Sequence, residues 1–476
     1  MLEKITPRTE DFSRWYTDVI AAGQLADYAP VKGCMVIRPN GFALWENFQR
    51  ALDGMFKETG HENAYFPLFI PESFLKKEAE HVEGFAPECA VVTHGGGKEL
   101  EEPLVVRPTS ETIIWAMFRK WIESYRDLPL LMNQWCNVVR WEMRTRLFLR
   151  TLEFLWQEGH TAHGTAEEAE EETRRMLEVY RRFAEDWMAM PVISGIKTER
   201  EKFAGAVRTY SIEAMMQDRK ALQSGTSHNL GQNFARAFDV TFQNERGERE
   251  FVWATSWGVS TRLIGALIMT HGDDKGIILP PKLAPTHCVL IPIYKGEDQR
   301  ALVLERLEAI GNTLSPDFKV KVDKREGYTP GWKFYDWEQK GVPLRVEMGP
   351  RDLAKNQVVL VRRDTGEKIP VGTEGLVDRV RDVLDAIQRS LFEKARSLML
   401  QNSVTLDDYL DVVRFLEGPG GFVYGRLCNS FSCEEKIQEE TKATVRCIPF
   451  DRPPDPGPCL VCGKTVDGRV VIAKGY

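Results

Sequence analysis

The sequence has no long hydrophobic run of the kind that crosses a membrane. Its most apolar stretch, residues 251–270, carries Arg262 and several small polar residues, whereas a membrane-spanning helix needs about 20 predominantly apolar residues. Residues 1–15 mix charged side chains with few apolar ones, so they lack the hydrophobic core of a secretory signal. We therefore expect a cytoplasmic protein with no membrane role.

The sequence also has no excess of positive charge and no disulfide framework. Its formal net charge of -7 argues against indiscriminate nucleic-acid binding, because such binding needs a strongly positive surface. A local basic face is still compatible with that charge. The nine cysteines are odd in number and scattered along the chain, which indicates reduced thiols. Internal repeats and low-complexity tracts are absent as well.

The length of the chain and its proline distribution predict the domain organisation. A chain of 476 residues suggests about three domains on a prior of ~150 residues each. The proline-rich segment 278–285 precedes a new strand pattern at 288–293, so we place the main boundary there. Strands and amphipathic segments then follow in the order of a small α/β domain. The predicted domains are 1–283, 284–393 and 394–476.

Hydrophobic periodicity predicts three of the helices and one early strand. Apolar residues recur at helical spacing over 42–56, 167–190 and 376–391, each of which indicates a helix with one buried face. The apolar run 65–70 reads as a strand, although it contains Pro67. The fold class expected from these patterns is α/β in the broad sense that includes α+β.

Four cysteines near the end of the sequence have the spacing of a zinc site. They form a C-x4-C pair and a C-x2-C pair, Cys428, Cys433, Cys459 and Cys462. Four thiolates favour tetrahedral zinc in a closed, structural site. Cys447 is the possible substitute ligand, and four unrelated buried thiols are the alternative. Both pairs keep ligand spacing, which favours the metal.

Residues 140–160 combine charged and aromatic side chains in a pattern that is unusual for a protein core. Arg140 and Glu142 precede a strand pattern whose alternate residues share one face, namely Arg150, Phe154, Trp156, Glu158 and His160. Burying these groups costs free energy unless they meet a charged, planar ligand. A nucleotide is such a ligand, and the alternative is a hairpin with a solvated outer face.

The wider sequence resembles a known enzyme family. The helix and strand at 41–72 with Pro67, the 140–160 segment and the Gly258-x3-Arg262 stretch resemble the three motifs of class II aminoacyl-tRNA synthetases. The strings RPTSET at 107–112, NQWCNVVRWE at 133–142, FLWQEGH at 154–160 and QSGTSHNLGQNF at 223–234 are similar to prolyl-tRNA synthetases of the archaeal and eukaryotic type. The resemblance covers essentially the whole chain.

This resemblance implies a fold, a reaction and a nucleotide site. It implies an antiparallel sheet flanked by helices, a homodimer built around the first motif, and ATP-dependent activation of L-proline to prolyl-adenylate followed by transfer to the 3′ end of tRNA(Pro). Arg140 and Arg262 are the implied catalytic residues, and Mg²⁺ is expected to bridge the phosphates beside Gln223, with Glu213 as a further candidate ligand. The full implied ATP-binding set is Arg140, Glu142, Arg150, Phe154, Gln223, Thr226, Ser260 and Arg262.

The resemblance also implies a proline site without an editing domain. Thr109 and Glu111 would receive the two hydrogens of the secondary ammonium. The implied proline-binding set is Thr109, Glu111, Arg140, Trp156, Glu158, His160 and His228. A missing methylene is worth only about 1–3 kcal/mol in such a pocket, so we expect some activation of alanine or cysteine. The sequence between the second and third motifs has no large insertion of the editing type.

The two C-terminal parts carry further implied contacts. Residues 341–353 are similar to an anticodon-binding domain, and exposed cations there could contact phosphates or bases of tRNA(Pro). The candidates are Arg345, Arg351, Lys355, Arg362 and Arg363. The chain ends in Tyr476, and the resemblance suggests that this ring docks near the active site, with ordinary fraying as the alternative.

Two functions of other classes remain as alternatives. One is a synthetase-like protein that binds tRNA or regulates another enzyme without catalysis. The other is a zinc-organised nucleic-acid module with an inactive upstream domain. Both are disfavoured because Arg140, Glu142 and Arg262 are all present, and a protein without catalysis has no need of this set.

Overall fold

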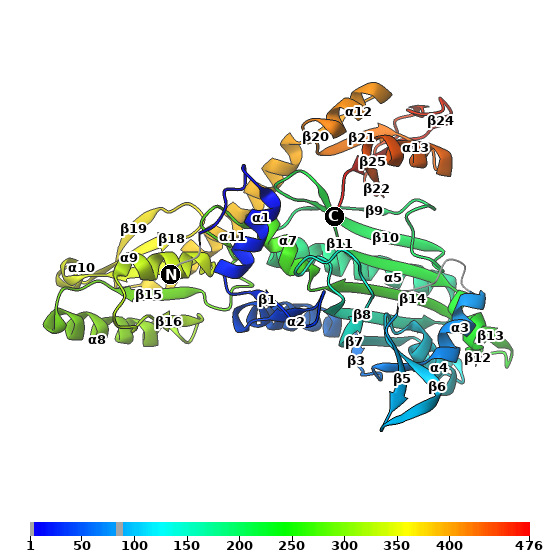
Figure 1. The fold of residues 1–476 in the computed structure, drawn as a ribbon, viewed down its shortest axis with the longest axis horizontal. Coiled ribbons are helices and arrows are strands. Elements are labelled where there is room, and N and C mark those ends of the chain that lie inside the picture. The colour runs from blue at the N-terminus through cyan, green and yellow to red at the C-terminus, as the bar shows by residue number, and fades with distance from the viewer. Residues whose placement is uncertain (1–3, 82–88) are drawn as a thin grey trace.

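The computed structural model describes residues 4–81 and 89–476, and a large sheet forms its centre (Figure 1). The sheet has 11 strands, and only the β20–β21 and β3–β7 pairs are parallel. This confirms the predicted antiparallel sheet. In spatial order the strands are β20 (Ser403–Thr405), β21 (Phe422–Arg426), β25 (Arg469–Ala473), β22 (Thr444–Pro449), β9 (Val192–Ile196), β10 (Arg208–Met215), β11 (Ala221–Gly231), β14 (Trp253–Ser260), β8 (Glu153–His163), β7 (Leu130–Val139) and β3 (Glu62–Asn63).

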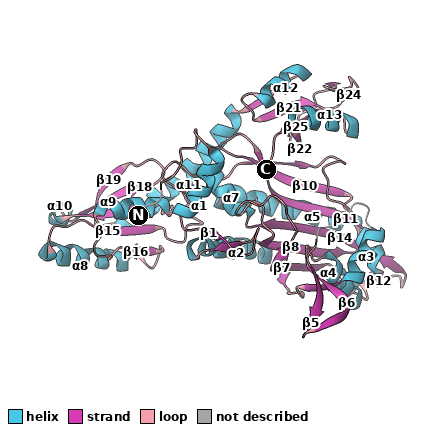
Figure 2. Cartoon of the chain, viewed as in Figure 1, coloured by secondary structure: helices cyan, strands magenta, loops and turns pink. Residues whose placement is uncertain are grey.

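Helices pack against this sheet (Figure 2), and together with the sheet they form the largest hydrophobic cluster of the described residues. Four of them contribute to that cluster, α1 (Phe12–Ala22), α2 (Pro39–Glu58), α5 (Ala166–Arg182) and α7 (Arg262–His271). The predicted helix 42–56 lies within α2. The predicted helix 167–190 begins as α5, where the Thr165 side chain caps the Glu168 N–H, and ends in a π-helical turn, Phe183–Trp187.

A second hydrophobic cluster joins the ends of β8, β11 and β14 to two helices, α4 (Glu111–Trp121) and α6 (Asn233–Phe238). Near them lies a small sheet of β4 (Phe69–Pro71), β6 (Lys98–Val106) and β5 (Val91–Gly95), with α3 (Glu72–His81) following β4. The remaining short elements of this region are β1 (Ala26–Tyr28), β2 (Met35–Ile37), η1 (Tyr125–Asp127), β12 (Thr241–Gln243) and β13 (Arg249–Phe251).

The strand predicted at 65–70 is wrong in its extent. Regular structure stops after Asn63 and resumes at Phe69. Pro67 has no N–H to donate to a ladder, and the Phe66 N–H instead donates to the Gln134 side chain at 2.5 Å. The segment between the two strands is therefore held by individual hydrogen bonds rather than by strand pairing.

The second region is a separate α/β layer with its own hydrophobic cluster. Its sheet has the order β16 (Val320–Val322), β15 (Cys288–Pro292), β17 (Leu344–Met348), β18 (Gln357–Arg362) and β19 (Lys368–Gly372). Its helices are α8 (Glu297–Leu314), α9 (Pro330–Gln339), α10 (Pro350–Ala354) and α11 (Leu376–Gln401). The predicted buried face of the last helix is confirmed, and α11 runs without a break through the boundary predicted at 393/394.

The C-terminal region extends the central sheet instead of standing apart from it. Its further elements are α12 (Tyr409–Glu417), α13 (Phe431–Thr441), β23 (Gly457–Pro458) and β24 (Thr465–Val466). β22 pairs with β9, where Ile448 lies opposite Ile196 and Pro449 opposite Gly195. A Cβ at Gly195 would lie 2.5 Å from the Ile448 carbonyl oxygen, so the close approach of the two strands requires glycine. Within the described residues, no helix is both long enough and apolar enough to cross a membrane.

Candidate active site

One cavity of about 350 Å³ opens over β8, β11 and β14, and a smaller one of about 140 Å³ adjoins it. Arg140, Phe154, Ser260 and Arg262 line both cavities. The larger cavity is also lined by Thr109, Glu111, Trp156, Glu158, His160, Gln223, Thr226 and His228, and the smaller one by Glu142 and Arg150. The structure thus brings together every residue that the sequence predicted for the ATP and proline sites.

Strand alternation in β8 explains much of the cavity wall. Phe154, Trp156, Glu158 and His160 project from one face, as the alternation predicts. Gln157 projects from the other, where it accepts a hydrogen bond from the Tyr180 hydroxyl. The prediction that Arg150 shares this strand face is wrong. It precedes β8, in a turn where it bridges to Arg146.

Two guanidinium groups, those of Arg140 and Arg262, face both cavities. Arg140 Nε donates to the Pro108 carbonyl at 2.9 Å, and Arg262 begins helix α7. Burial lowers the pKa of both, and Arg150 and Arg140 add repulsion that takes the pKa of Arg262 to about 10. Like charges gathered in a desolvated site are stabilised by a bound anion. A polyphosphate is the anion that several guanidinium groups hold best.

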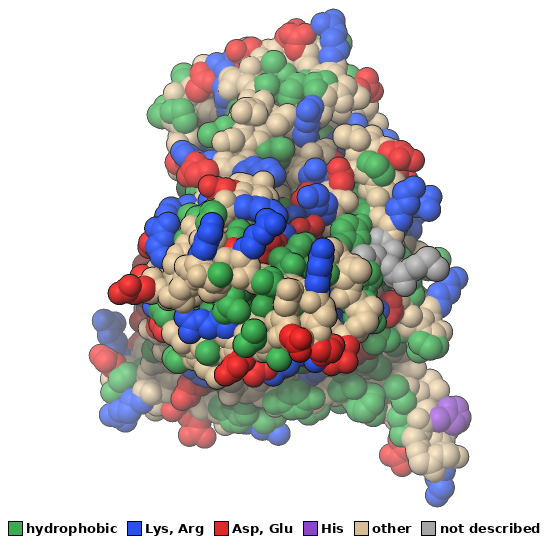
Figure 3. All heavy atoms as spheres, turned by 90° about the vertical axis from the view of Figure 1, so that its left-hand side faces the viewer, with side chains coloured by type: hydrophobic (Ala, Val, Ile, Leu, Met, Phe, Trp, Pro, Cys, Tyr) green, Lys and Arg blue, Asp and Glu red, His purple; other side chains and the backbone are tan. Residues whose placement is uncertain are grey.

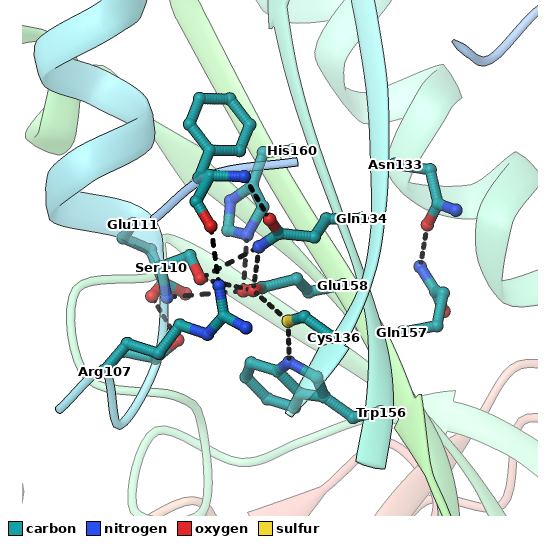
Figure 4. Close-up of polar contacts among 12 residues, drawn as sticks. Arg107, Ser110, Glu111, Asn133, Gln134, Cys136, Trp156, Gln157, Glu158 and His160 are labelled. Atoms are coloured by element: carbon teal, nitrogen blue, oxygen red, sulfur yellow. Dashed lines mark hydrogen bonds and ion pairs between the residues drawn. The ribbon is translucent and has the colours of Figure 1, made fainter. Parts of the chain in front are cut away.

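Glu158, which lines the larger cavity, is the centre of a hydrogen-bond network (Figure 4). Its carboxylate accepts from Ser110 Oγ at 2.5 Å, Gln134 Nε2 at 2.9 Å and Cys136 Sγ at 3.4 Å, and lies 3.0 Å from His160 Nε2. Burial favours the neutral acid, but the hydrogen bond and charge of His160 outweigh it and keep the pKa of Glu158 below its usual range. Glu158 therefore orients its neighbours, and its oxygens are already bonded.

The two pocket histidines have different electrostatic surroundings. Burial, with the nearby His160, lowers the pKa of His228 to about 3, so this ring is neutral at physiological pH. Burial also opposes a proton on His160, but Glu158 outweighs it and raises the pKa of His160. Among the described residues, the Nδ1 atom of His160 has no hydrogen-bond partner although it is buried.

Thr109 and Glu111 lie at the start of α4, on the same side of the cavity as Arg140. The Thr109 hydroxyl donates to the Glu111 carboxylate, and both side chains are buried. A buried carboxylate next to a hydroxyl offers acceptors for an ammonium group. The Pro108 carbonyl that binds Arg140 immediately precedes this pair, so one short segment positions all three side chains.

Several cavity residues were missed by the sequence reasoning. Phe203 packs on the His228 ring with centroids 4.7 Å apart, and Glu201 and Thr209 also line the cavity. Phe203 comes from an irregular segment between β9 and β10 with no periodic pattern, so nothing in the sequence marked it. Gln134 and Cys136 lay inside a recognised string, but their bonds to Glu158 depend on the fold.

Glu213, expected as a magnesium ligand, is committed elsewhere. It is fully buried, and its oxygens lie 2.7 Å from Lys197 Nζ and 2.9 Å from Arg446 Nη2. Both carboxylate oxygens of Glu213 therefore form ion pairs with cationic side chains, and the expectation that Glu213 binds magnesium is wrong. The pairs instead tie β10 to the C-terminal β22. Gln223 does line the main cavity.

The four predicted zinc ligands come together. The sulfur atoms of Cys428, Cys433, Cys459 and Cys462 all lie within 4.8 Å of one another. Four thiols at such spacing fit one tetrahedral ion, and the first three are buried. Cys447 lies in another hydrophobic cluster, against Val471 and Phe422, so its suggested role as a substitute ligand is wrong.

The last residue, Tyr476, is docked rather than frayed. Its hydroxyl donates to Asp218 at 2.6 Å, and its backbone N–H donates to the Ala221 carbonyl. The Arg146 guanidinium lies 5.5 Å from its ring centroid and 4.6 Å from that of Tyr16. Arg146 belongs to the turn before β8, so the C-terminus buttresses the loop that lines the smaller cavity.

We therefore expect Tyr476→Ala to raise the KM for ATP about 2- to 10-fold, because one cation–π contact is worth about 1 kcal/mol. The KM for proline should not change, since Tyr476 contacts the turn beside the smaller cavity, whereas Thr109 and Glu111 line the larger one. Steady-state kinetics of amino-acid activation provide the measurement. Tyr476→Phe, which keeps the ring, should resemble the unaltered enzyme. An unchanged KM for ATP in the alanine variant would contradict this role.

Comparisons with known proteins agree with this geometry. Residues 92–271 match the tRNA synthetase class II core domain (G, H, P, S and T), residues 287–383 match an anticodon binding domain, and residues 409–476 match the C-terminal domain of prolyl-tRNA synthetase. The sequence is 58% identical over 486 residues to the proline–tRNA ligase of Chlorobium luteolum and 58% identical over 485 residues to that of Chlorobium limicola, with 100% of both chains covered in each comparison.

A third relative, the proline–tRNA ligase of Porphyromonas gingivalis, is 57% identical over 490 residues, which cover 100% of this chain and 99% of the relative. The archaeal and eukaryotic subtype stays a prediction. Identity at this level over whole chains, together with three family domains in order, leaves little room for the non-catalytic alternatives. The chain belongs to the proline–tRNA ligase family, class II aminoacyl-tRNA synthetases that use ATP to attach proline to tRNA(Pro).

Proposed function

We propose that the two adjoining cavities bind ATP and proline side by side, with Arg140 between them. The observation that carries this proposal is that Arg140 and Arg262 line both cavities, while Thr109 and Glu111 lie on one side of Arg140 and Glu142 on the other. A charged nucleotide and a small ammonium-bearing substrate match these two ends. The domain limits 283/284 and 393/394 remain part of the proposal.

The nucleotide end supplies contacts to the base and to the phosphates. Glu142 accepts from the adenine amino group, Phe154 stacks beneath the ring, and Arg262 covers its other face while it reaches the terminal phosphate. The surrounding polar contacts come from Arg150, Gln223, Thr226 and Ser260, which all line one of the cavities. The Glu142 carboxylate lies 3.4 Å from Arg150, and this contact holds the turn in place for the base.

The proline end is small and partly apolar. Thr109 and Glu111 accept the two hydrogens of the secondary ammonium, and the neutral His228 ring with Trp156 encloses the pyrrolidine. The indole N–H of Trp156 donates to Cys136 Sγ at 3.2 Å, which fixes the plane of this wall. Glu158 acts through His160 and Ser110, because its own oxygens are already bonded.

The chemistry needs no general base, because the nucleophile is already a carboxylate. A proline carboxylate oxygen attacks the α-phosphorus, the new P–O bond forms, and pyrophosphate leaves with the electrons of the broken P–O bond. Arg140 orients the carboxylate against the α-phosphate, and both arginines stabilise the charge that develops. The tRNA 3′-terminal hydroxyl then attacks the prolyl carbonyl, its proton passes to the phosphate of the adenylate, and AMP leaves with the electrons of the broken C–O bond.

A magnesium ion fits this site only if water molecules and phosphate oxygens supply most of its ligands. Gln223 offers one amide oxygen, and an ion held so weakly by side chains keeps several waters and phosphate oxygens. When bound, the ion neutralises phosphate charge. The four-cysteine cluster fits zinc with protein ligands alone, and we propose that it binds a structural zinc ion that holds α13 against the last strands.

The assembly and location are further parts of the proposal. We propose a homodimer built around the first motif, where Tyr65 and Phe69 are 71% and 44% exposed. Large exposed rings beside this motif suit a subunit interface. We also propose that the enzyme works in the cytoplasm, where aminoacylated tRNA is used.

Glu111→Ala should abolish proline-dependent exchange of pyrophosphate into ATP, with a loss of at least about 100-fold, the usual effect of removing one charged contact in a desolvated site. The reason is that the substrate ammonium loses its carboxylate partner in a buried site. Isotope exchange with saturating ATP measures it. Glu46→Ala, the same change on the exposed side of α2, is the control. Near-normal exchange in the Glu111 variant would remove this residue from the site.

A further inference from the structure

The segment between β16 and α9, together with the first turn of α9, carries two aromatic rings stacked beside an arginine. The ring centroids of Tyr328 and Trp332 lie 4.0 Å apart with an angle of 24° between the planes. Arg325 lies over both rings, with Cζ 5.7 Å and 5.0 Å from their centroids. We call these three residues the aromatic stack. They belong to the domain that matches an anticodon binding domain.

The inner edge of the stack is fixed by carboxylates. Arg325 Nε and Nη2 donate to the two oxygens of Asp323 at 3.0 Å and 2.6 Å, and Nη1 lies 2.8 Å from Asp336 Oδ2. The Trp337 indole N–H also donates to Asp323 at 2.8 Å. A bidentate pair of this kind fixes the plane of the guanidinium. The Arg325 guanidinium is therefore held in a fixed plane, and the carboxylates of Asp323 and Asp336 neutralise its charge.

The outer rings are held in place but take no part in a hydrophobic core. Tyr328 is 47% exposed and Trp332 is half-buried. The hydrophobic clusters of the described residues include Phe334 and Trp337 from this region, but neither ring of the stack. The Thr329 hydroxyl caps α9 by accepting from the Trp332 N–H at 3.2 Å. The fold therefore orients an aromatic face toward solvent without needing it for packing.

The charges around the stack favour a planar partner over a phosphate. Lys324 lies 2.5 Å from Glu308, and Arg300 pairs with Glu326. Phosphate binding draws on cations that are not already neutralised, whereas base stacking needs an accessible π face and tolerates any base. Figure 3 turns this end of the molecule toward the viewer and shows exposed hydrophobic side chains lying among Lys, Arg, Asp and Glu side chains.

We propose that the aromatic stack is the platform on which one unpaired base of the tRNA anticodon loop stacks. Unpaired loop bases are the part of an RNA that proteins read by stacking on aromatic rings and guanidinium planes. The stack offers both surfaces in one rigid unit, on the domain whose family binds anticodons. This inference rests on the proposed function, because it requires the enzyme to charge tRNA.

The first test compares charging with activation. Trp332→Ala and Tyr328→Ala should each raise the KM for tRNA about tenfold or more in aminoacylation, the usual effect of losing one stacked base. Proline-dependent pyrophosphate exchange, which needs no tRNA, should be unchanged. Trp332→Phe should restore most of the lost affinity. Leu302→Ala, at another exposed apolar position of the same domain, is the matched control and should leave the KM for tRNA unchanged.

The second test identifies the base. Transcripts of the tRNA with single abasic nucleotides in the anticodon loop are charged by the unaltered enzyme and by the Trp332→Ala variant. At the stacked position the two enzymes should charge the abasic transcript equally well, whereas at the other positions the variant should stay weaker. Normal KM values for tRNA in both alanine variants would overturn the inference. Loss of exchange in the unaltered enzyme would instead overturn the proposed function.

Discussion

Arg140→Ala should reduce proline-dependent pyrophosphate exchange by about 100- to 1,000-fold, the usual cost of removing one preorganised donor at the reacting centre. The loss should fall on kcat as well as on KM, because the guanidinium orients the attacking carboxylate and also stabilises charge at the α-phosphorus. Its position supports a large effect, since it lines both cavities and is anchored to Pro108. Arg140→Lys should recover only part of the activity, because a lysine presents no planar fork.

The control for this prediction is Arg119→Ala. That arginine is exposed and pairs with Asp239 on the outer side of α4, so its loss should leave exchange within about twofold of the unaltered enzyme, as expected for a surface ion pair. Exchange by the Arg140 variant within tenfold of the unaltered enzyme would show that the carboxylate is oriented by another group.

Cys433→Ser should release the metal and unfold the C-terminal region. A structural zinc ion contributes about 10–16 kcal/mol in small zinc domains, which is as large as the whole stability of a typical domain, about 5–15 kcal/mol. Because β22 pairs directly with β9, we expect the damage to reach the catalytic sheet and to lower activation. Metal analysis of the purified protein and limited proteolysis provide the measurements, with about one zinc ion per chain expected in the unaltered protein.

Cys34→Ser is the matched control, since Cys34 is a half-buried thiol outside the cluster. It should retain zinc, protease resistance and activity. A metal-free preparation of the unaltered protein that is fully folded and active would contradict the zinc assignment. Retention of metal and stability by the Cys433 variant would exclude that residue as a ligand.

The parts of the fold that local periodicity dictates were predictable. The 3.6-residue spacing of Leu376, Val380 and Val383 predicted the buried face of α11, and the apolar spacing over 167–190 predicted the helix that begins as α5. The strand predicted at 65–70 was wrong in its extent, because Pro67 has no N–H for strand pairing and regular structure resumes only at Phe69. The pairing of β22 with β9 could not be predicted, because it depends on partners about 250 residues apart and on the missing side chain of Gly195.

Site residues were predictable where they alternate along a strand or belong to a string that resembles the family. Phe154 and Trp156 followed from their spacing, and the resemblance supplied Gln223 and His228. The hydrogen bonds that commit Glu158 to its neighbours and Glu213 to Lys197 could not be predicted, because charge alone does not reveal which partner a carboxylate meets. Phe203 was missed for a similar reason, since its contact with His228 is made by a loop.

Pyrophosphate exchange with each of the twenty amino acids tests the central claim most directly, namely that the cavity beside Arg140 is shaped for proline. Proline should drive strong exchange, alanine and cysteine weak exchange, and the remaining amino acids essentially none. The account would be contradicted if a larger amino acid drove exchange as well as proline does, or if the folded, zinc-containing enzyme showed no exchange with proline.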